Sequence, residues 1–284
     1  MTIAACYLSP EGLVLGADST STLGVGVGPS NMHHFNFGQK VFEVGQSSTL
    51  AMATWGVGSL DTTSFRTLIA RFADDLRDAP PGNMALAAER WARLFDAAID
   101  RSIFGPVRVA AREVLLKATR TPEEEKSLSV ARNFAGGFCF GGYLSSTRTP
   151  EAFEIVWDLV SPARVHPVEM GAPRFWGVPN LISRVLYGAD LDFVDAIAAS
   201  GKWSGTPAEL FDILRPFVLV RPMVLPVREA IDWVYSSIYT TIKAMKFSEL
   251  APVCGGPIEV GLVTTDRPFR WVVHKGMDAA IQLI

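Results

Sequence analysis

The sequence predicts an α+β protein in which two stacked, mainly antiparallel sheets are faced by helices. The predicted elements follow the order strands, helices, strands, helices, strands, which differs from the strict alternation of strand and helix in a parallel doubly wound sheet. Neighbouring strands are joined by short turns, as in hairpins. The helical segments place apolar side chains at spacings of three and four residues, so one face of each helix is expected to cover a sheet.

Four strands precede the first helix. The first two turn into each other through Ser9-Pro10-Glu11-Gly12, and the other two through Gly45-Gln46-Ser47, so each pair is predicted to be a hairpin. The segment from Ser19 to Gln39 is rich in Gly, Ser and Thr and is predicted to be a loop. The strands are predicted at residues 2–8, 13–18, 40–44 and 48–54.

The rest of the chain alternates between helical and strand-forming blocks. Asn83 is a candidate N-cap for the second helix. Residues 106–131 are charged and predicted to be partly helical, as an insertion within a single domain that spans residues 1–284. Helices are predicted at 60–77, 84–103, 181–187, 192–199, 207–214 and 226–246, and strands at 138–144, 152–157, 174–178, 258–263 and 269–274.

Composition limits the partners and the compartment. Hydrophobic residues make up 49% of the chain and charged residues 19%, which favours burial of apolar surface between subunits and hence a homo-oligomer. A net charge of -3 without a basic block argues against nucleic acid as a partner. The cysteines, Cys6, Cys139 and Cys254, lack metal-ligand spacing, and with no signal peptide or membrane-spanning run the expected location is cytoplasmic.

The Met1-Thr2 junction carries the main chemical signal. A small residue after the initiator methionine is normally exposed by methionine removal, which would leave Thr2 with both a hydroxyl and a free α-amine. An α-amine has a reference pKa of about 7.7–8.0 and can accept the hydroxyl proton near neutral pH. Thr2 is therefore a candidate nucleophile that carries its own base, provided that Met1 is removed.

Four segments together resemble a known family. They are Thr2-Ile3-Ala4-Ala5, the run from Gly12 to Ser19, the run from Lys40 to Val44, and the run from Met52 to Gly56. They resemble proteasome β-type subunits and simpler bacterial relatives, which are N-terminal-nucleophile hydrolases. The resemblance implies a four-layer αββα sandwich, a peptide or unfolded protein as substrate, and assembly into a homo-oligomeric ring or barrel. It also implies that an ATP-dependent unfoldase can be a partner, and that no metal or organic cofactor is needed.

The resemblance implies a role for each of five residues. Thr2 matches the nucleophile, and Asp18 matches the active-site aspartate. Lys40 matches a lysine that lowers the pKa of the threonine amine by its positive charge. Gly56, which follows Thr54 and Trp55, matches a backbone N–H donor of the oxyanion hole, a kind of contact worth about 2.7–4 kcal/mol in the transition state. Thr22 matches a threonine that binds an extended peptide substrate by strand addition.

The second half of the chain departs from the family pattern. Cys254-Gly255-Gly256 stands where the family often has a serine and two glycines, and Ala251 replaces a supporting aspartate. Glu249 is close enough in sequence to replace that acid, and a supporting serine near the Phe138 strand is not placed. Cys254 is a competing nucleophile, but no histidine has a sequence context that points to it, so a packed thiol is favoured.

These observations favour a threonine-type endopeptidase and leave two alternatives open. An amidase that hydrolyses a small-molecule amide would use the same residues, so only substrate profiling separates it from a peptidase. A catalytically inactive structural subunit is the other alternative, and Ala251 and the unplaced serine favour it. Retention of Met1 would also favour it, because acylation of the Thr2 nitrogen removes the base.

Overall fold

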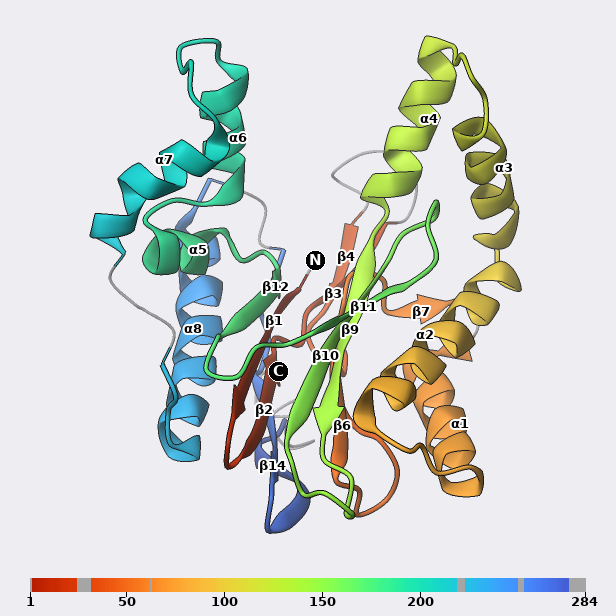
Figure 1. Cartoon of the computed structure of the whole chain (residues 1–284), viewed down its shortest axis with the longest axis vertical. Helices are drawn as coiled ribbons and strands as arrows, with labels where there is room; N and C mark the ends of the chain where they lie inside the picture. Colours follow the sequence, from red (N-terminus) through yellow and green to blue (C-terminus); the bar gives the residue numbers. More distant parts are fainter. Residues whose placement is uncertain (1, 25–31, 62, 219–222, 250–252, 276–284) are drawn as a thin grey trace.

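Two five-stranded antiparallel sheets lie face to face at the centre of the molecule, and helices cover both outer faces (Figure 1). The computed structural model of the protein describes residues 2–24, 32–61, 63–218, 223–249 and 253–275. The first sheet contains, in spatial order, β12 (Arg174–Gly177), β1 (Ile3–Ser9), β2 (Gly12–Ala17), β13 (Glu259–Thr264) and β14 (Arg267–Val273). The second contains β11 (Arg164–Pro167), β10 (Glu151–Trp157), β9 (Gly136–Gly142), β6 (Leu50–Trp55) and β5 (Val41–Glu43). The predicted α+β class with two antiparallel sheets is confirmed.

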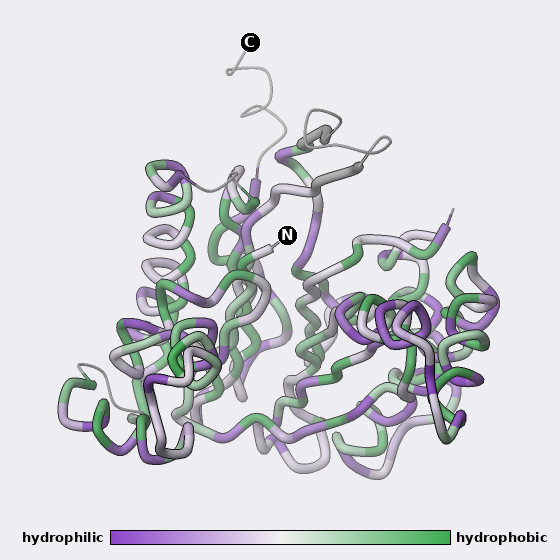
Figure 2. Tube along the Cα trace, turned by 90° about the horizontal axis from the view of Figure 1, so that it is seen from above, coloured by the Kyte–Doolittle hydropathy of each residue, from purple (hydrophilic) through white to green (hydrophobic). Residues whose placement is uncertain are grey.

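Helices form the two outer layers. α8 (Val227–Phe247) packs on β1 and β2 of the first sheet, whereas α1 (Phe65–Asp78) and α2 (Met84–Asp100) cover the second sheet. The view from above in Figure 2 shows the strands in the middle with helical coils at both sides. The remaining helices are α3 (Gly105–Leu115), α4 (Pro122–Asn133), α5 (Asn180–Tyr187), α6 (Leu191–Ala199), α7 (Pro207–Leu214) and the 3-10 helix η2 (Arg215–Phe217).

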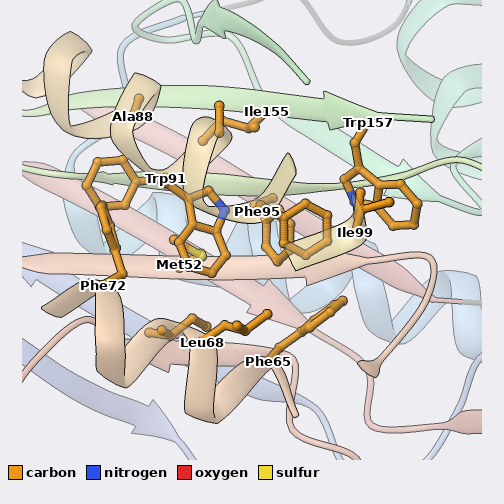
Figure 3. Packing of buried hydrophobic residues seen from close by; sticks show 14 of the residues in the cluster. Met52, Phe65, Leu68, Phe72, Ala88, Trp91, Phe95, Ile99, Ile155 and Trp157 are labelled. Atoms are coloured by element: carbon orange, nitrogen blue, oxygen red, sulfur yellow. The ribbon is translucent and has the colours of Figure 1, made fainter. Parts of the chain in front are cut away.

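The layer between the second sheet and its helices is filled with aromatic side chains. Phe95 of α2 packs edge-on against Phe138 of β9, with 4.7 Å between ring centroids, and Trp91 does so at 4.9 Å. Phe72 of α1 and Trp157 of β10 complete this cluster (Figure 3). The helical spacing of the apolar residues in α1 and α2 is what brings these rings onto one face.

The layer between the two sheets has mostly small side chains. Ala4 and Cys6 of β1 and Ala17 of β2 face Ala53 of β6 and Cys139 of β9 in one buried cluster. Because the side chains of a strand alternate between its two faces, the same strands send their other residues toward the helices. Small residues here allow β1 and β2 to pack closely on β6.

Two sequence predictions need correction. The segment 19–39, predicted as a loop, contains a hairpin of β3 (Ser21–Gly24) and β4 (Met32–Phe35), whose glycine-rich sequence lacks the alternation that marks a strand. The helix predicted from residue 60 begins at Phe65, after a short hairpin of β7 (Ser59–Leu60) and β8 (Thr63–Ser64). It begins there because the Ser64 hydroxyl accepts the backbone N–H of Thr67, at 3.2 Å, as an N-cap.

Other predicted elements agree with the structure within a few residues. Asn83 caps α2, because its Oδ1 accepts the backbone N–H of Leu86 at 2.8 Å. The charged segment 106–131 holds most of α3 and most of α4, while its description as an insertion into a single domain stays a prediction. Among the residues that the structure describes, none of the helices has the length and apolar character needed to cross a membrane.

Candidate active site

Four of the five residues predicted for the site, all except Thr22, lie next to strand ends of the two large sheets. Antiparallel pairing puts the start of β1 beside the end of β2, with Ala4 opposite Ala17. Thr2 directly precedes β1, and Asp18 directly follows β2. In the second sheet, Lys40 precedes β5 and Gly56 follows β6. Because β1 and β2 pack on β6, the two pairs face each other across the layer between the sheets.

The carboxylate of Asp18 is fully buried and accepts four hydrogen bonds. Its Oδ1 accepts from Nζ of Lys40 at 2.7 Å and from the backbone N–H of Ile3 at 3.0 Å. Its Oδ2 accepts from the backbone N–H groups of Thr20, at 3.1 Å, and Gly255, at 2.9 Å. A buried charge is tolerated when it is paired and hydrogen-bonded in this way. One carboxylate oxygen, Oδ1 of Asp18, therefore binds both Lys40 and Ile3, the residue after Thr2.

Lys40 links the two sheets at these strand ends. Its side chain is 7% exposed, and Nζ donates to Oδ1 of Asp18 and to the carbonyl oxygen of Thr20, at 2.6 Å. Burial lowers the pKa of the Lys40 ammonium and the positive charge of Lys275 acts in the same direction, while the Asp18 carboxylate opposes both. Lys40 and Asp18, 22 residues apart in the chain, thus lie in direct contact, while the roles expected for them stay predictions.

The main chain of Thr2 is held from the other side by β12. The backbone N–H of Val178 donates to the carbonyl oxygen of Thr2 at 3.0 Å, and Gly177 lies opposite Ile3. A Cβ atom at Gly177 would lie 1.7 Å from that carbonyl oxygen, and its φ of +91° suits only glycine well. Thr2 is 3% exposed in the chain that includes Met1, and with these contacts its backbone position is fixed.

Gly56 lies in a bend after β6 and is exposed. Its φ is +88°, and an added Cβ would come within 2.7 Å of Cα of Gly136. Both the backbone conformation and the close approach of β9 therefore require glycine at this position. The preceding residue, Trp55, stacks on Trp176, which lies opposite Ala4 in the β1–β12 pair. This stack links the segment that contains Gly56 to β1 through β12, and the oxyanion role of Gly56 stays a prediction.

The turn that contains Cys254 and Gly255 binds the Asp18 segment directly. Besides donating to Asp18, Gly255 accepts the backbone N–H groups of Ser19 and Thr20 at its carbonyl oxygen, each at 3.0 Å. Cys254 is 4% exposed. Burial, and then the negative charge of Asp18, raise the pKa of the Cys254 thiol to about 12. Since the thiolate is the nucleophilic form, the competing assignment of Cys254 as nucleophile has no support.

Three other predicted residues have different outcomes. Thr22 lies in β3 opposite His34, and its role in substrate binding stays a prediction. Glu249 follows α8 as an exposed residue, so nothing in its position favours the substitute role that its sequence position suggested. Ala251 lies outside the described residues.

Sequence reasoning missed a second ion pair beside the site. Glu259, the first residue of β13, is fully buried, and its Oε2 lies 3.0 Å from Nζ of Lys275. Lys275 also donates to the carbonyl oxygen of Gly38, at 3.0 Å, and to the hydroxyl of Ser19, at 3.4 Å. A charged residue at the start of the otherwise apolar strand Glu259–Thr264 was the available signal, but its partner comes from beyond the next strand.

Comparisons with known proteins correct the family assignment. No protein-family model and no curated protein matches the chain. The assignment to proteasome β-type subunits and their bacterial relatives is therefore wrong, because its short motifs are not accompanied by a match of the chain to any family. Among solved structures, the chain is similar to the Anbu (Gly-1) mutant from Hyphomicrobium sp. strain MC1, with 16% identity, a TM-score of 0.48 and alignment over 100% of this chain and 96% of that chain. A likeness of this extent identifies neither a family nor an activity.

Proposed function

We propose that the protein is a hydrolase of peptide bonds whose nucleophile is the hydroxyl of Thr2, made reactive by removal of Met1. The observation that supports this proposal most is the shared oxygen of Asp18. Oδ1 accepts both Nζ of Lys40, at 2.7 Å, and the backbone N–H of Ile3, the residue after Thr2, at 3.0 Å. A buried cation is thereby held next to the residue that would carry the nucleophile and the base.

The proposed reaction proceeds by acyl transfer to Thr2. The α-amine of Thr2 accepts the hydroxyl proton through a water molecule while Oγ bonds to the carbonyl carbon of the scissile peptide. The C–N bond then breaks, the leaving amine takes up the proton, and an ester to Thr2 remains. Water hydrolyses this ester, which releases the carboxylic acid and restores the hydroxyl. The net reaction is amide plus water to acid plus amine.

Lys40 and Gly56 have separate roles in the proposed reaction. Lys40 acts on the hydroxyl and the amine of Thr2, and Gly56 acts on the oxyanion. In the described part of the chain Nζ of Lys40 donates to two acceptors, and an ammonium has three N–H donors. The remaining donor is assigned to the Thr2 hydroxyl, and the positive charge keeps the α-amine neutral by lowering its pKa. The N–H of Gly56, an exposed residue, is assigned to the oxygen that becomes negative when Oγ adds to the carbonyl.

The test uses the full-length protein and a peptidyl epoxyketone. This electrophile forms a morpholine ring only with a hydroxyl and an amine on one residue, so it reports the nucleophile and the base together. We expect an intact mass without Met1, an epoxyketone adduct on Thr2, and hydrolysis of a peptidyl coumarin amide. Thr2→Ala should abolish labelling and reduce kcat at least about 1000-fold.

The matched control is Thr119→Ala, a change of the same kind at an exposed position between α3 and α4. It should label and hydrolyse like the wild type. A purified protein that retains Met1, fails to label and fails to hydrolyse the peptide would refute the proposal. Labelling of Thr2 with hydrolysis of small amides but of no peptide would keep the nucleophile and replace the substrate class.

A further inference from the structure

A stacked pair of tryptophans bridges the two sheets at the candidate site. The rings of Trp55, at the end of β6, and Trp176, in β12, are nearly parallel, with 4.4 Å between centroids and 5° between planes. They are 9% and 8% exposed, in the layer whose other members are mostly small. Such a pair contributes attraction beyond the apolar area that it buries. It is thus a rigid contact between a strand of the first sheet and a strand of the second.

On the first sheet, Trp176 belongs to the segment that holds Thr2. It lies opposite Ala4, and the next residue, Gly177, lies opposite Ile3. The residue after that, Val178, donates its N–H to the carbonyl oxygen of Thr2. A shift of Trp176 would therefore move the main-chain contacts that position Thr2.

On the second sheet, Trp55 directly precedes Gly56, the proposed oxyanion donor. Two glycines of β9 leave room for this segment, because a Cβ at Gly137 would lie 2.3 Å from Cζ2 of Trp55 and one at Gly136 would lie 2.8 Å from the carbonyl oxygen of Trp55. The ring of Trp55 is thus confined between β9 and Trp176. The orientation of its own backbone, and so of the Gly56 N–H, follows from that confinement.

Glu154 ties Trp176 to the second sheet a second time. Its Oε1 accepts the indole N–H of Trp176 at 2.6 Å. Glu154 belongs to β10 and lies opposite Cys139 of β9. A hydrogen bond to a carboxylate is shorter and stronger than one between neutral groups. A partly buried carboxylate with this contact fixes the rotation of the ring as well as its position.

We propose that Trp55, Trp176 and Glu154 form a clamp that sets the distance and angle between Thr2 and the N–H of Gly56. The proposal rests on the proposed function, and it makes these side chains positioning residues that do not touch the substrate. An oxyanion donor acts over a narrow range of distances, about 2.7–3.1 Å. A displacement of about 1 Å can reduce the rate about 100-fold. Loosening the clamp should therefore reduce kcat and leave substrate binding largely intact.

The test compares Trp176→Leu, Trp176→Phe and Glu154→Leu, with Trp91→Leu as the matched control in the helix-side core. Kinetics use a peptidyl coumarin amide at a temperature where circular dichroism shows each variant folded. Trp176→Leu should lower kcat about 100-fold while KM changes less than about threefold. Trp176→Phe, which keeps a stacked ring, should have a kcat about tenfold higher than that of Trp176→Leu. Glu154→Leu should have about the same kcat as Trp176→Phe. Trp91→Leu should lower stability and keep kcat.

Each result bears on a different part of the proposal. A wild type that hydrolyses the amide through Thr2, together with a folded Trp176→Leu variant of unchanged kcat, overturns the clamp and leaves the proposed function intact. A wild type without Thr2-dependent hydrolysis overturns both. If Trp176→Leu does not fold, the kcat values of Trp176→Phe and Glu154→Leu decide the matter, and unchanged values in both overturn the clamp.

Discussion

The two faces of the second sheet are covered by different kinds of side chain. On its helix side, large rings such as Phe72, Trp91 and Phe95 pack against the strands (Figure 3). On the side that faces the first sheet, small residues predominate, and charged groups are buried at one end. The first layer has the composition of a core that stabilises the fold through apolar burial. The second brings two sheets close enough for Lys40 of one to reach Asp18 of the other.

This difference suggests a division between stability and chemistry. Burying charges is costly unless each charge is paired and hydrogen-bonded, so a fold keeps them only where the geometry is well determined. The Asp18–Lys40 and Glu259–Lys275 pairs lie where strands of both sheets end, and backbone N–H groups complete the contacts of Asp18. The aromatic layer behind the second sheet then stabilises the fold, and the contacts between the two sheets set the geometry of this end.

The largest effect should come from removing the cation between the sheets. In Lys40→Met, Asp18 remains buried without its charged partner, so we expect the free energy of unfolding to fall by about 3–5 kcal/mol. Labelling of Thr2 and peptide hydrolysis should also be lost. The double variant Asp18→Asn with Lys40→Met should recover much of the stability and none of the activity. Urea denaturation and epoxyketone labelling at pH 7 measure the two effects separately.

An exposed ion pair provides the control. Arg77 and Asp74 of α1 lie 2.9 Å apart with side chains 71% and 60% exposed. Arg77→Met should change the free energy of unfolding by less than about 1 kcal/mol, because water screens and solvates exposed charges. Undiminished labelling of Thr2 in folded Lys40→Met would contradict a catalytic role for Lys40.

The next largest effect should be a loss of stability when a ring of the aromatic layer is removed. Phe95 is fully buried and contacts the rings of Phe65, Trp91 and Phe138. Phe95→Ala should lower the free energy of unfolding by about 3–5 kcal/mol through lost burial and the cavity that remains. The kcat of the folded fraction should stay within about threefold of the wild type. Urea denaturation together with kinetics at low temperature tests this.

A smaller truncation, Phe95→Leu, gives the same comparison if the alanine variant is unfolded. A large fall in kcat in a stably folded Phe95 variant would contradict the division between the two layers, because it would show that site geometry depends on packing behind the second sheet.

Local patterns predicted most of the elements, and long-range contacts escaped prediction. The stripe of α8 and the alternation in β10 are repeated signals within one element, so they can be read directly. Asp18 and Lys40 were singled out by the family resemblance, in which Asp18 ends one predicted strand and Lys40 begins another. The hairpin of β3 and β4 was missed because glycine and serine mark turns in sequence, although pairing with a neighbour can still order them as strands.

The rest of the site depends on partners far apart in the chain. Gly255 donates to Asp18 across 237 residues, and Lys275 donates to Ser19 across 256. Neither contact has a periodic signal, since each needs a single side chain or N–H at the right place. The stack of Trp55 and Trp176 has the same origin, because two isolated tryptophans become neighbours only after β12 pairs with β1.

The smallest expected effect is a change in the pH dependence of stability, caused by the Cys254 thiol near Asp18. The pKa of the Cys254 thiol is raised from 9.0 to about 12, first by burial and then by the Asp18 carboxylate. An unfolded chain therefore loses this proton at lower pH than the folded protein, and the folded state binds more protons between these values. The stability associated with the neutral thiol is fully present below about pH 9 and is lost as pH rises toward about 12.

Cys254→Ala should accordingly flatten the alkaline part of the stability profile. Urea denaturation of the wild type and the variant from pH 7 to about pH 11 measures this, and the difference between the two profiles removes the contribution of other titrating groups. We expect the wild type to lose more stability than the variant above about pH 9. Profiles that stay parallel would contradict the raised pKa.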